Sequence, residues 1–292
     1  MIEPWLLFAL IAVFMYGTSQ TIVKVALGNI SVATMIIINF IITMPIYATL
    51  LVASSLRTDL SQVGLQILLI GFLAALLGRA GYYTYLEALE SGPVTIVGSV
   101  TAAYPAIIAI LALTVLRESI TPIQAIGVAL VVGGIVALSY ASNGRKNEKK
   151  LSRKAIIYCA ATLAIWGIWG LFAKMALLVL SIGTYLGLYT LALPIVLSGY
   201  MICKGIGIKK AFPRWSLPVK IAAISIMIGQ IGLFADTTAV SIGNASIVFP
   251  LIAAYPIITI LEAQLFLKEA LARKDIILIA LVIIGILLVS TV

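Results

Sequence analysis

The sequence predicts an all-α integral membrane protein with ten transmembrane helices, arranged as two inverted five-helix repeats. Three observations lead to this prediction: a very apolar composition, one polar linker at the middle of the chain, and a second half that repeats the first. Of the 292 residues, 63% are hydrophobic and 10% are charged, and the mean hydropathy is +1.20. Soluble domains carry roughly a quarter charged residues. A water-soluble fold cannot bury so much apolar surface, so the bilayer is the expected solvent.

Apolar runs of membrane-spanning length follow one another along the chain. A bilayer core takes about 20 apolar residues per helix, and glycine, proline, asparagine and charged clusters separate runs of this length. The first repeat, 1–141, is expected to span the membrane near 4–27, 31–54, 64–89, 93–116 and 121–141. The second repeat, 154–292, is expected to span it near 154–179, 182–203, 217–241, 245–267 and 272–292. Residues 142–153 are polar and basic, which predicts a solvated linker.

The second half of the chain repeats the first. The tetrapeptide Ala-Ala-Tyr-Pro occurs at residues 102–105 and again 151 residues later, at 253–256. Further identities keep this offset: Gly78, Gly81, Gly92, Glu118 and Gly134 correspond to Gly229, Gly232, Gly243, Glu269 and Gly285. Because five spans is an odd number, the second repeat is expected to enter the membrane from the opposite side. Inverted repeats of this kind serve alternating access in transporters. A duplication kept for stability alone is the other interpretation.

Short patterns near the ends of the spans also recur in both halves. They are Tyr16-Gly17 with Lys24, Trp166-Gly167 with Lys174, and the span endings Arg117-Glu118 and Lys268-Glu269. Because these patterns occur in this order and are duplicated, the chain resembles the drug/metabolite transporter (DMT) superfamily, specifically its ten-helix EamA-type branch. The resemblance extends over nearly the whole length of the chain. Tyr16 stands where that family commonly has tryptophan. The resemblance implies a substrate cavity lined mainly by helices one, three, four, six, eight and nine. It implies no particular substrate, because superfamily members move amino acids, sugars and nucleotide sugars, organic cations and xenobiotics.

Arg79 is the strongest candidate for contact with a substrate. It lies near the middle of the third span, and Tyr82 and Tyr83 follow at the i+3 and i+4 positions that share its helical face. A guanidinium between aromatic rings can bind a carboxylate through paired hydrogen bonds, while apolar groups rest on the rings. The competing interpretation is an arginine held by a helix-end carbonyl or by a neighbouring acid.

Asp236 is the candidate acid of the predicted cavity. It shares a helical face of the eighth span with Gly229 and Gly232, and its counterpart in the first half is Tyr85. A carboxylate there can pair with an arginine, bind an amine or take up a proton, so Asp236 is also a candidate for ion coupling. Glu262 is a second candidate for coupling. Glu87, like Glu262, is close enough to a helix end to reach the membrane interface.

Prolines and aromatic residues supply the remaining candidates. Pro105 and Pro256 fall at mid-span in both repeats, where a proline removes a backbone hydrogen bond and bends the helix. We expect them to act as hinges, with a static kink as the alternative. The aromatic and amide side chains expected to point toward the substrate are Tyr104, Tyr255, Trp166, Trp169 and Gln230.

The basic residues predict the orientation of the chain. The formal net charge is +9. Most cations lie in the linker and in the connections between spans seven and eight and between nine and ten: Arg145, Lys146, Lys149, Lys150, Arg153, Lys154, Lys204, Lys209, Lys210, Arg214, Lys220, Lys268, Arg273 and Lys274. The opposite connections offer chiefly Arg57 and Arg117. The positive-inside rule therefore places the linker in the cytosol and both termini outside a plasma membrane. We interpret these cations as topology signals and expect no nucleic-acid partner.

Four side chains inside the spans receive structural interpretations. Lys24 and Lys174 close the first and sixth spans, where a cation offsets the helix dipole and can reach outward to the interface. Cys159 and Cys203 both lie in apolar runs without a CxxC pattern, and we expect both to be small core residues.

The predicted function is secondary transport of a small polar or zwitterionic metabolite by alternating access, with amino-acid-like export favoured. Alternatives are the transport of organic or quaternary ammonium cations, which aromatic cages bind, and a lipid-handling or structural role. The chain contains no histidine and no GxxxxGK[ST] motif, so we expect neither an enzyme nor an ATP-driven pump. No cofactor or metal is expected; the partners are the substrate, the bilayer and a proton that couples transport. The oligomeric state stays open.

Overall fold

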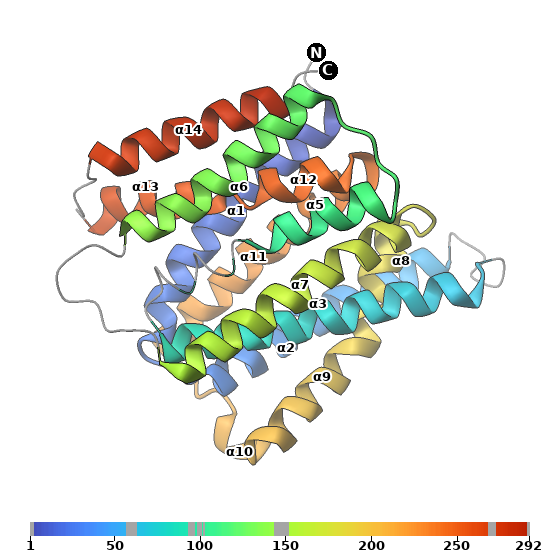
Figure 1. Cartoon of the computed structure of the whole chain (residues 1–292). Coiled ribbons are helices and arrows are strands. Elements are labelled where there is room, and N and C mark those ends of the chain that lie inside the picture. The colour runs from blue at the N-terminus through green and yellow to red at the C-terminus, as the bar shows by residue number, and fades with distance from the viewer. Residues whose placement is uncertain are drawn as a thin grey trace.

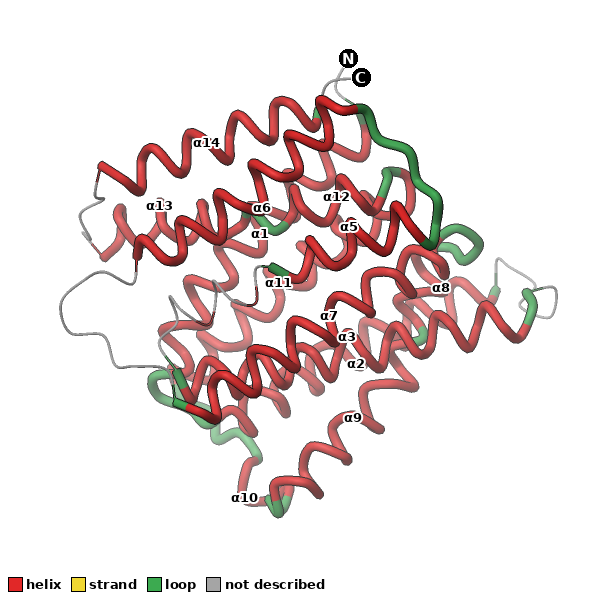
Figure 2. Tube along the Cα trace, in the orientation of Figure 1, coloured by secondary structure: helices red, strands yellow, loops and turns green. Residues whose placement is uncertain are grey.

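A computed structural model of the chain describes residues 3–56, 63–92, 97, 101, 103–142, 152–267 and 273–290. In this part of the chain the regular secondary structure is helical (Figures 1 and 2). The helices are α1 (Pro4–Leu27), α2 (Val32–Ser55), α3 (Leu65–Ser91), α5 (Tyr104–Thr114), α6 (Pro122–Ser142), α7 (Arg153–Leu177), α8 (Ile182–Gly187), α9 (Tyr189–Lys204), α10 (Ile208–Ala211), α11 (Leu217–Ile242), α12 (Ala245–Ile252), α13 (Tyr255–Leu267) and α14 (Arg273–Val289).

Six helical segments among the described residues are long and apolar enough to cross a bilayer by length and composition. They are α1, α2, α3, α7, the segment from α8 through α9, and α11. Shorter apolar helices occur in α5, α6, α12–α13 and α14. Large apolar side chains cover the outer surface, such as Ile202, which is 79% exposed, and such a surface requires lipid rather than water around it. The chain is a multi-pass membrane protein, and the count of ten spans remains a prediction.

Serine side chains fix the starts of three helices. Ser31, Ser152 and Ser181 each accept a hydrogen bond from the backbone N–H three residues later, at 3.0–3.1 Å. This N-cap satisfies one of the donors that a helix start leaves without an intrahelical partner. Ser31 and Ser181 lie 150 residues apart, so equivalent helices of the two repeats begin with the same contact.

Two helix pairs, α1 with α11 and α3 with α7, form the centre of the molecule. They are equivalent pairs, since α1 corresponds to α7 and α11 to α3 in the two repeats. Gly232 of α11 packs on the ring of Tyr16, and its counterpart Gly81 of α3 packs on the ring of Trp166. A Cβ at either glycine would overlap the ring. Glycine is therefore what allows the helices of each pair to approach so closely.

The expected ninth span is interrupted. Helix α12 ends at Ile252 and α13 starts at Tyr255, so Pro256 lies in the first turn of a new helix. Pro105 has the same place in α5. The prediction that both prolines bend a continuous helix at mid-span was wrong. A proline in the first turn removes no intrahelical hydrogen bond, because the N–H groups there have no partner within the helix.

Helix α1 begins and α14 ends near one another, far from the point where α6 ends and α7 begins (Figure 1). Most of the predicted linker, residues 143–151, lies outside the described residues.

Candidate functional site

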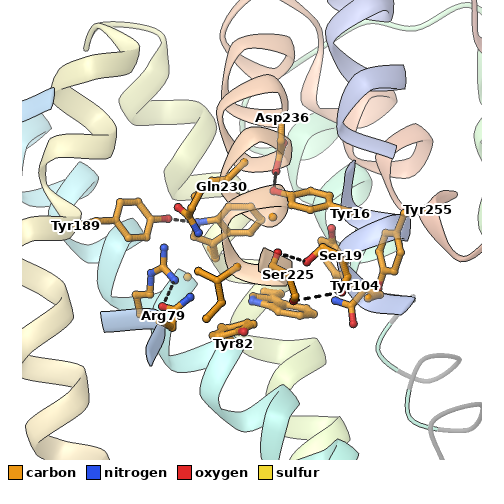
Figure 3. Close-up of a pocket in the computed structure, with 18 residues that line it drawn as sticks. Tyr16, Ser19, Arg79, Tyr82, Tyr104, Tyr189, Ser225, Gln230, Asp236 and Tyr255 are labelled. Atoms are coloured by element: carbon orange, nitrogen blue, oxygen red, sulfur yellow. Dashed lines mark hydrogen bonds between the residues drawn. The ribbon is translucent and has the colours of Figure 1, made fainter. Parts of the chain in front are cut away.

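A cavity of about 160 Å³ lies between the α1–α11 pair and the α3–α7 pair (Figure 3). All but one of the substrate-binding residues predicted from the sequence line it: Arg79, Tyr82, Tyr104, Trp166, Trp169, Gln230, Asp236 and Tyr255. Sequence reasoning missed a further set of polar lining residues: Tyr16, Ser19, Gln20, Asn39, Tyr189 and Ser225. Helices α2 and α9 contribute Asn39 and Tyr189 to this cavity. These helices belong to the second and seventh expected spans, and neither span was expected to line the cavity.

The aromatic walls of the cavity follow the duplication. Tyr16 meets Tyr255 edge to face with ring centroids 6.3 Å apart. Trp166 meets Tyr104 in the same manner at 5.3 Å. Because Tyr16 corresponds to Trp166 and Tyr255 to Tyr104, these are two copies of one contact. This contact is therefore duplicated, whereas the lining residues Trp169 and Tyr82 correspond to Ser19 and Leu233 in the other repeat.

Arg79 is buried and is bound by neutral groups. Its side chain donates from Nη1 to Asn39 Oδ1 at 3.0 Å and from Nη2 to the hydroxyl of Tyr47. The guanidinium carbon lies 5.4 Å from the ring centroid of Tyr47 and 5.1 Å from that of Tyr189. These are not the rings that helical spacing predicted. Among the described residues no carboxylate forms an ion pair with Arg79, and its Nε lacks a hydrogen-bond partner.

Asp236 is also buried, and it is only half satisfied. Its side chain is on α11, and Oδ2 accepts a hydrogen bond of 3.0 Å from the hydroxyl of Tyr16. The other carboxylate oxygen, Oδ1, has no partner. No lysine or arginine of the described chain pairs with this acid. In Figure 3 the Asp236–Tyr16 pair and Arg79 lie in different parts of the cavity, so the two opposite charges do not neutralise one another.

A buried hydroxyl joins the two repeats through Arg79. Tyr47 accepts from Arg79 and donates to Gln230 Oε1. Gln230 lies 151 residues after Arg79, so the two side chains occupy equivalent positions of the two repeats. The duplication thus places an arginine on one side of the Tyr47 hydroxyl and a neutral amide on the other.

Comparison with protein families identifies the chain. The EamA-like transporter family matches residues 3–140 and again residues 153–291. The chain belongs to this family. The predicted membership of the DMT superfamily is confirmed, and the chain is a membrane transporter of small substrates. A solved structure titled "Crystal structure of protein" has the same fold, with a TM-score of 0.73 at 17% identity, over 99% of this chain and 96% of the other. No curated protein matches the chain.

Tyr83 and Glu262 of this EamA-like transporter lie outside the cavity. The ring of Tyr83 packs on Tyr200 at 5.6 Å between centroids, within an apolar cluster, and its hydroxyl has no partner. Tyr82 and Tyr83 therefore diverge, although both follow Arg79 on one helical face. Glu262 is partly buried and accepts a hydrogen bond of 2.5 Å from Thr18 on α1. Neither residue is placed to contact a molecule in the cavity.

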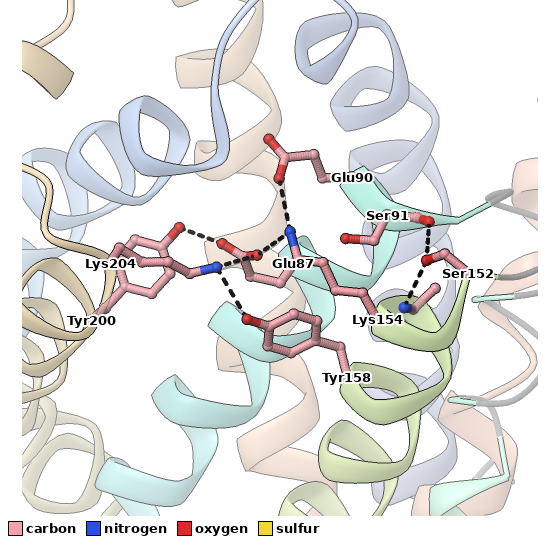
Figure 4. Close-up of polar contacts among 9 residues, drawn as sticks. Glu87, Glu90, Ser91, Ser152, Lys154, Tyr158, Tyr200 and Lys204 are labelled. Carbon is pink, nitrogen blue, oxygen red and sulfur yellow. Dashed lines mark hydrogen bonds and ion pairs between the residues drawn. The ribbon is translucent and has the colours of Figure 1, made fainter.

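Glu87 is the centre of a separate ionic cluster near the start of α7 (Figure 4). The carboxylate accepts from Lys204 at 2.5 Å and from the Tyr200 hydroxyl at 2.6 Å, and Lys154 lies 3.5 Å away. Lys204 also donates to the hydroxyl of Tyr158 at 3.1 Å. Glu87 is 3% exposed, because the side chains of this cluster cover it, and the expectation that it reaches the membrane interface stays a prediction. The cluster ties α3 to α7 and α9.

Lys174 of the transporter is also buried. Its Nζ donates to the carbonyls of Val240 and Gly243, at 2.8 Å each, at the end of α11. Glu118 accepts from the backbone N–H groups of Ala245 and Ser246, at 2.9 Å each, at the start of α12. A cation at a helix C-terminus and an anion at an N-terminus both stabilise the dipole. Lys174 thus offsets the dipole of a neighbouring helix. The expectation that its side chain extends outward to the interface was wrong. The Lys24 side chain lies outside the described residues.

The two cysteines differ. Cys159 is buried on α7, whereas Cys203 is exposed near the end of α9. The prediction of a core position was therefore wrong for Cys203, because an apolar run in a membrane protein also faces lipid.

Proposed function

We propose that this transporter moves a small zwitterionic metabolite, most favourably an amino-acid-like molecule, by alternating access. One observation carries the proposal: a buried arginine and a buried aspartate line the same cavity, and neither has a counter-ion among the described residues.

Unpaired charges in a membrane interior are expensive unless a partner or water compensates them. A substrate with one anionic and one cationic group would compensate both. Its carboxylate would meet the N–H groups of Arg79 that remain after the bonds to Asn39 and Tyr47, because a guanidinium has five donors. Its ammonium group would meet the unpartnered oxygen of Asp236.

The dimensions of the cavity favour a small molecule. Its volume of about 160 Å³ is close to that of an engineered cavity of about 150 Å³ that binds benzene. The rings of Tyr82, Trp166 and Trp169 in the lining suit an apolar side chain.

The positions of the charges support a link between binding and movement. Arg79 belongs to the α3–α7 pair and Asp236 to the α1–α11 pair. A zwitterion held by both side chains would draw the two helix pairs together. The duplicated sequence favours inverted repeats, which expose a central site alternately to the two sides.

A gradient would supply the energy, since the chain has no P-loop motif. Asp236 can bind a proton after the substrate leaves, because its free oxygen otherwise stays unpaired in the cavity. Glu262 is the weaker candidate for coupling, because it lies outside the cavity and is bound by Thr18. The charge bias supports a plasma-membrane orientation with a cytosolic linker and both termini outside.

Transport of an organic cation is the second candidate. The aromatic lining and the free oxygen of Asp236 favour it. The uncompensated charge of Arg79 opposes it by repulsion.

Thermal stabilisation of the purified protein by a metabolite library tests both candidates, because a ligand that binds the folded state raises the melting temperature. The informative variants are Arg79→Gln, which introduces the residue found at the equivalent position 230, and Asp236→Asn. Tyr83→Phe, outside the cavity, is the control. Stabilisation by amino acids that is lost in the first two variants and kept in the control supports the proposal. Stabilisation by quaternary amines that survives Arg79→Gln would replace the zwitterion with a cation.

A further inference from the structure

The connection between α9 and α11, together with the first turn of α11, has an unusual charge distribution, and we call this segment, residues 205–220, the basic connection. Four cations lie on it, Lys209, Lys210, Arg214 and Lys220, and all four are exposed. Within the described residues none of them pairs with an acid. The sequence contains no aspartate or glutamate between residues 149 and 235. Within the part of the chain that the structure describes, the positive charge of this surface is therefore uncompensated.

The same connection exposes large apolar side chains. Trp215 is 81% exposed, Leu217 is 69% exposed and Phe212 is 58% exposed. The connection joins two segments of membrane-spanning length, α8–α9 and α11, so it lies at the boundary of the bilayer. Tryptophan is enriched at this depth, because its ring suits the headgroup region.

The backbone holds the basic connection in a defined place. Gly205 ends α9 in the left-handed conformation, with a φ of 61°, which directs the chain away from the helix. Ala211 is buried in the apolar cluster formed with α2, and this contact anchors the short helix α10. Helix α10, which carries the exposed Lys209 and Lys210, lies at the edge of the molecule in Figure 1.

Helix stability does not account for the position of Lys220. Lys220 lies in the first turn of α11, where the positive end of the helix dipole repels a cation. An external anion would make this position favourable.

The duplication provides an internal comparison. The equivalent stretch of the first repeat, residues 54–70, contains one cation, Arg57, one acid, Asp59, and no aromatic residue. Cations and aromatic anchors are therefore a property of this connection and not of the repeat. A topology signal alone would require cations but not the exposed tryptophan.

We propose that the basic connection binds the anionic phospholipid headgroups of the leaflet that it faces. The cations would contact lipid phosphates, and Trp215 and Phe212 would insert at the depth of the headgroups. This inference concerns the surface of the transporter and is independent of its substrate.

Lipid selectivity measured by electron spin resonance tests the proposal. The purified full chain is placed in phosphatidylcholine bilayers with spin-labelled phosphatidylglycerol or spin-labelled phosphatidylcholine. We expect the wild type to associate preferentially with the anionic lipid and to lose this preference as salt is raised. The variant Lys209→Gln/Lys210→Gln should reduce the preference about fivefold or more, since one cation near an anionic surface contributes about fivefold.

Arg153→Gln/Lys274→Gln is the matched control, because it removes two exposed cations from other connections expected on the same face. It should keep most of the preference. Melting in neutral lipid checks that both variants fold. The proposal is overturned if the wild type shows no preference for the anionic lipid, or if the Lys209/Lys210 variant keeps the wild-type preference. It is also overturned if the control variant loses as much preference as the Lys209/Lys210 variant, since the preference would then depend on the net charge of the protein and not on the basic connection.

Discussion

Removal of the Tyr47 hydroxyl is the sharpest test of the polar contact that joins the two repeats. Tyr47 is 1% exposed, and its hydroxyl is bound to Arg79 and to Gln230. The variant Tyr47→Phe keeps the ring and removes both hydrogen bonds. A bond to a charged group contributes about 1.5–3 kcal/mol, and a neutral bond inside a membrane protein about 0.6 kcal/mol. We therefore expect the free energy of unfolding to fall by about 2–3 kcal/mol.

The chain contains its own control for this experiment. Tyr83 is also buried, at 3% exposure, but its hydroxyl has no partner, so Tyr83→Phe should leave stability unchanged or raise it slightly. Melting of both variants and the wild type in one detergent gives the comparison, and a loss of about 2 kcal/mol corresponds to a fall of about 3 °C for a chain of this length. If Tyr47→Phe and Tyr83→Phe melt at the same temperature, the bridging role of the hydroxyl is refuted.

Three further variants test contacts between helices, each by thermal or chemical unfolding. Lys174→Met leaves two carbonyls at the end of α11 without their donor and should cost about 1–3 kcal/mol; an unchanged stability would contradict that contact. Glu87→Gln should destabilise the transporter through the buried bond to Lys204, with a coupling energy measurable in a double-mutant cycle with Lys204→Met; zero coupling would refute it. Gly81→Ala should cost about 1–3 kcal/mol, because the new methyl group overlaps Trp166, whereas Gly199→Ala, which meets no neighbour within 4 Å, should cost nothing.

The family and the membrane character of the chain followed from its sequence, because composition and duplication act over the whole length. The cavity was predictable in part. Arg79, Asp236 and the repeated tyrosines stand out, since charges and equivalent aromatics are rare in apolar helices. Their partners were not predictable, because Asn39 and Tyr47 come from α2, which carries no charge and no motif. Only the packing of α2 against α11 brings Tyr47 to Gln230.

Two other errors have separate physical causes. Periodicity shows which residues share a helical face, but it cannot show how wide a neighbouring cavity is. Tyr82 faces the cavity and Tyr83, one position on, faces an apolar cluster. In a bilayer, moreover, apolar sequence does not distinguish the core from the lipid-facing surface, which explains the error at Cys203.

The Tyr47 hydroxyl touches two side chains that stand at the same place in the two repeats. A rotation that exchanges the two halves leaves points near its axis almost stationary and carries distant points furthest. Under alternating access this hydroxyl would act as a pivot. A substrate group bound beside it would keep the same neighbours whichever side of the membrane the cavity faces, while the end near Asp236 would travel.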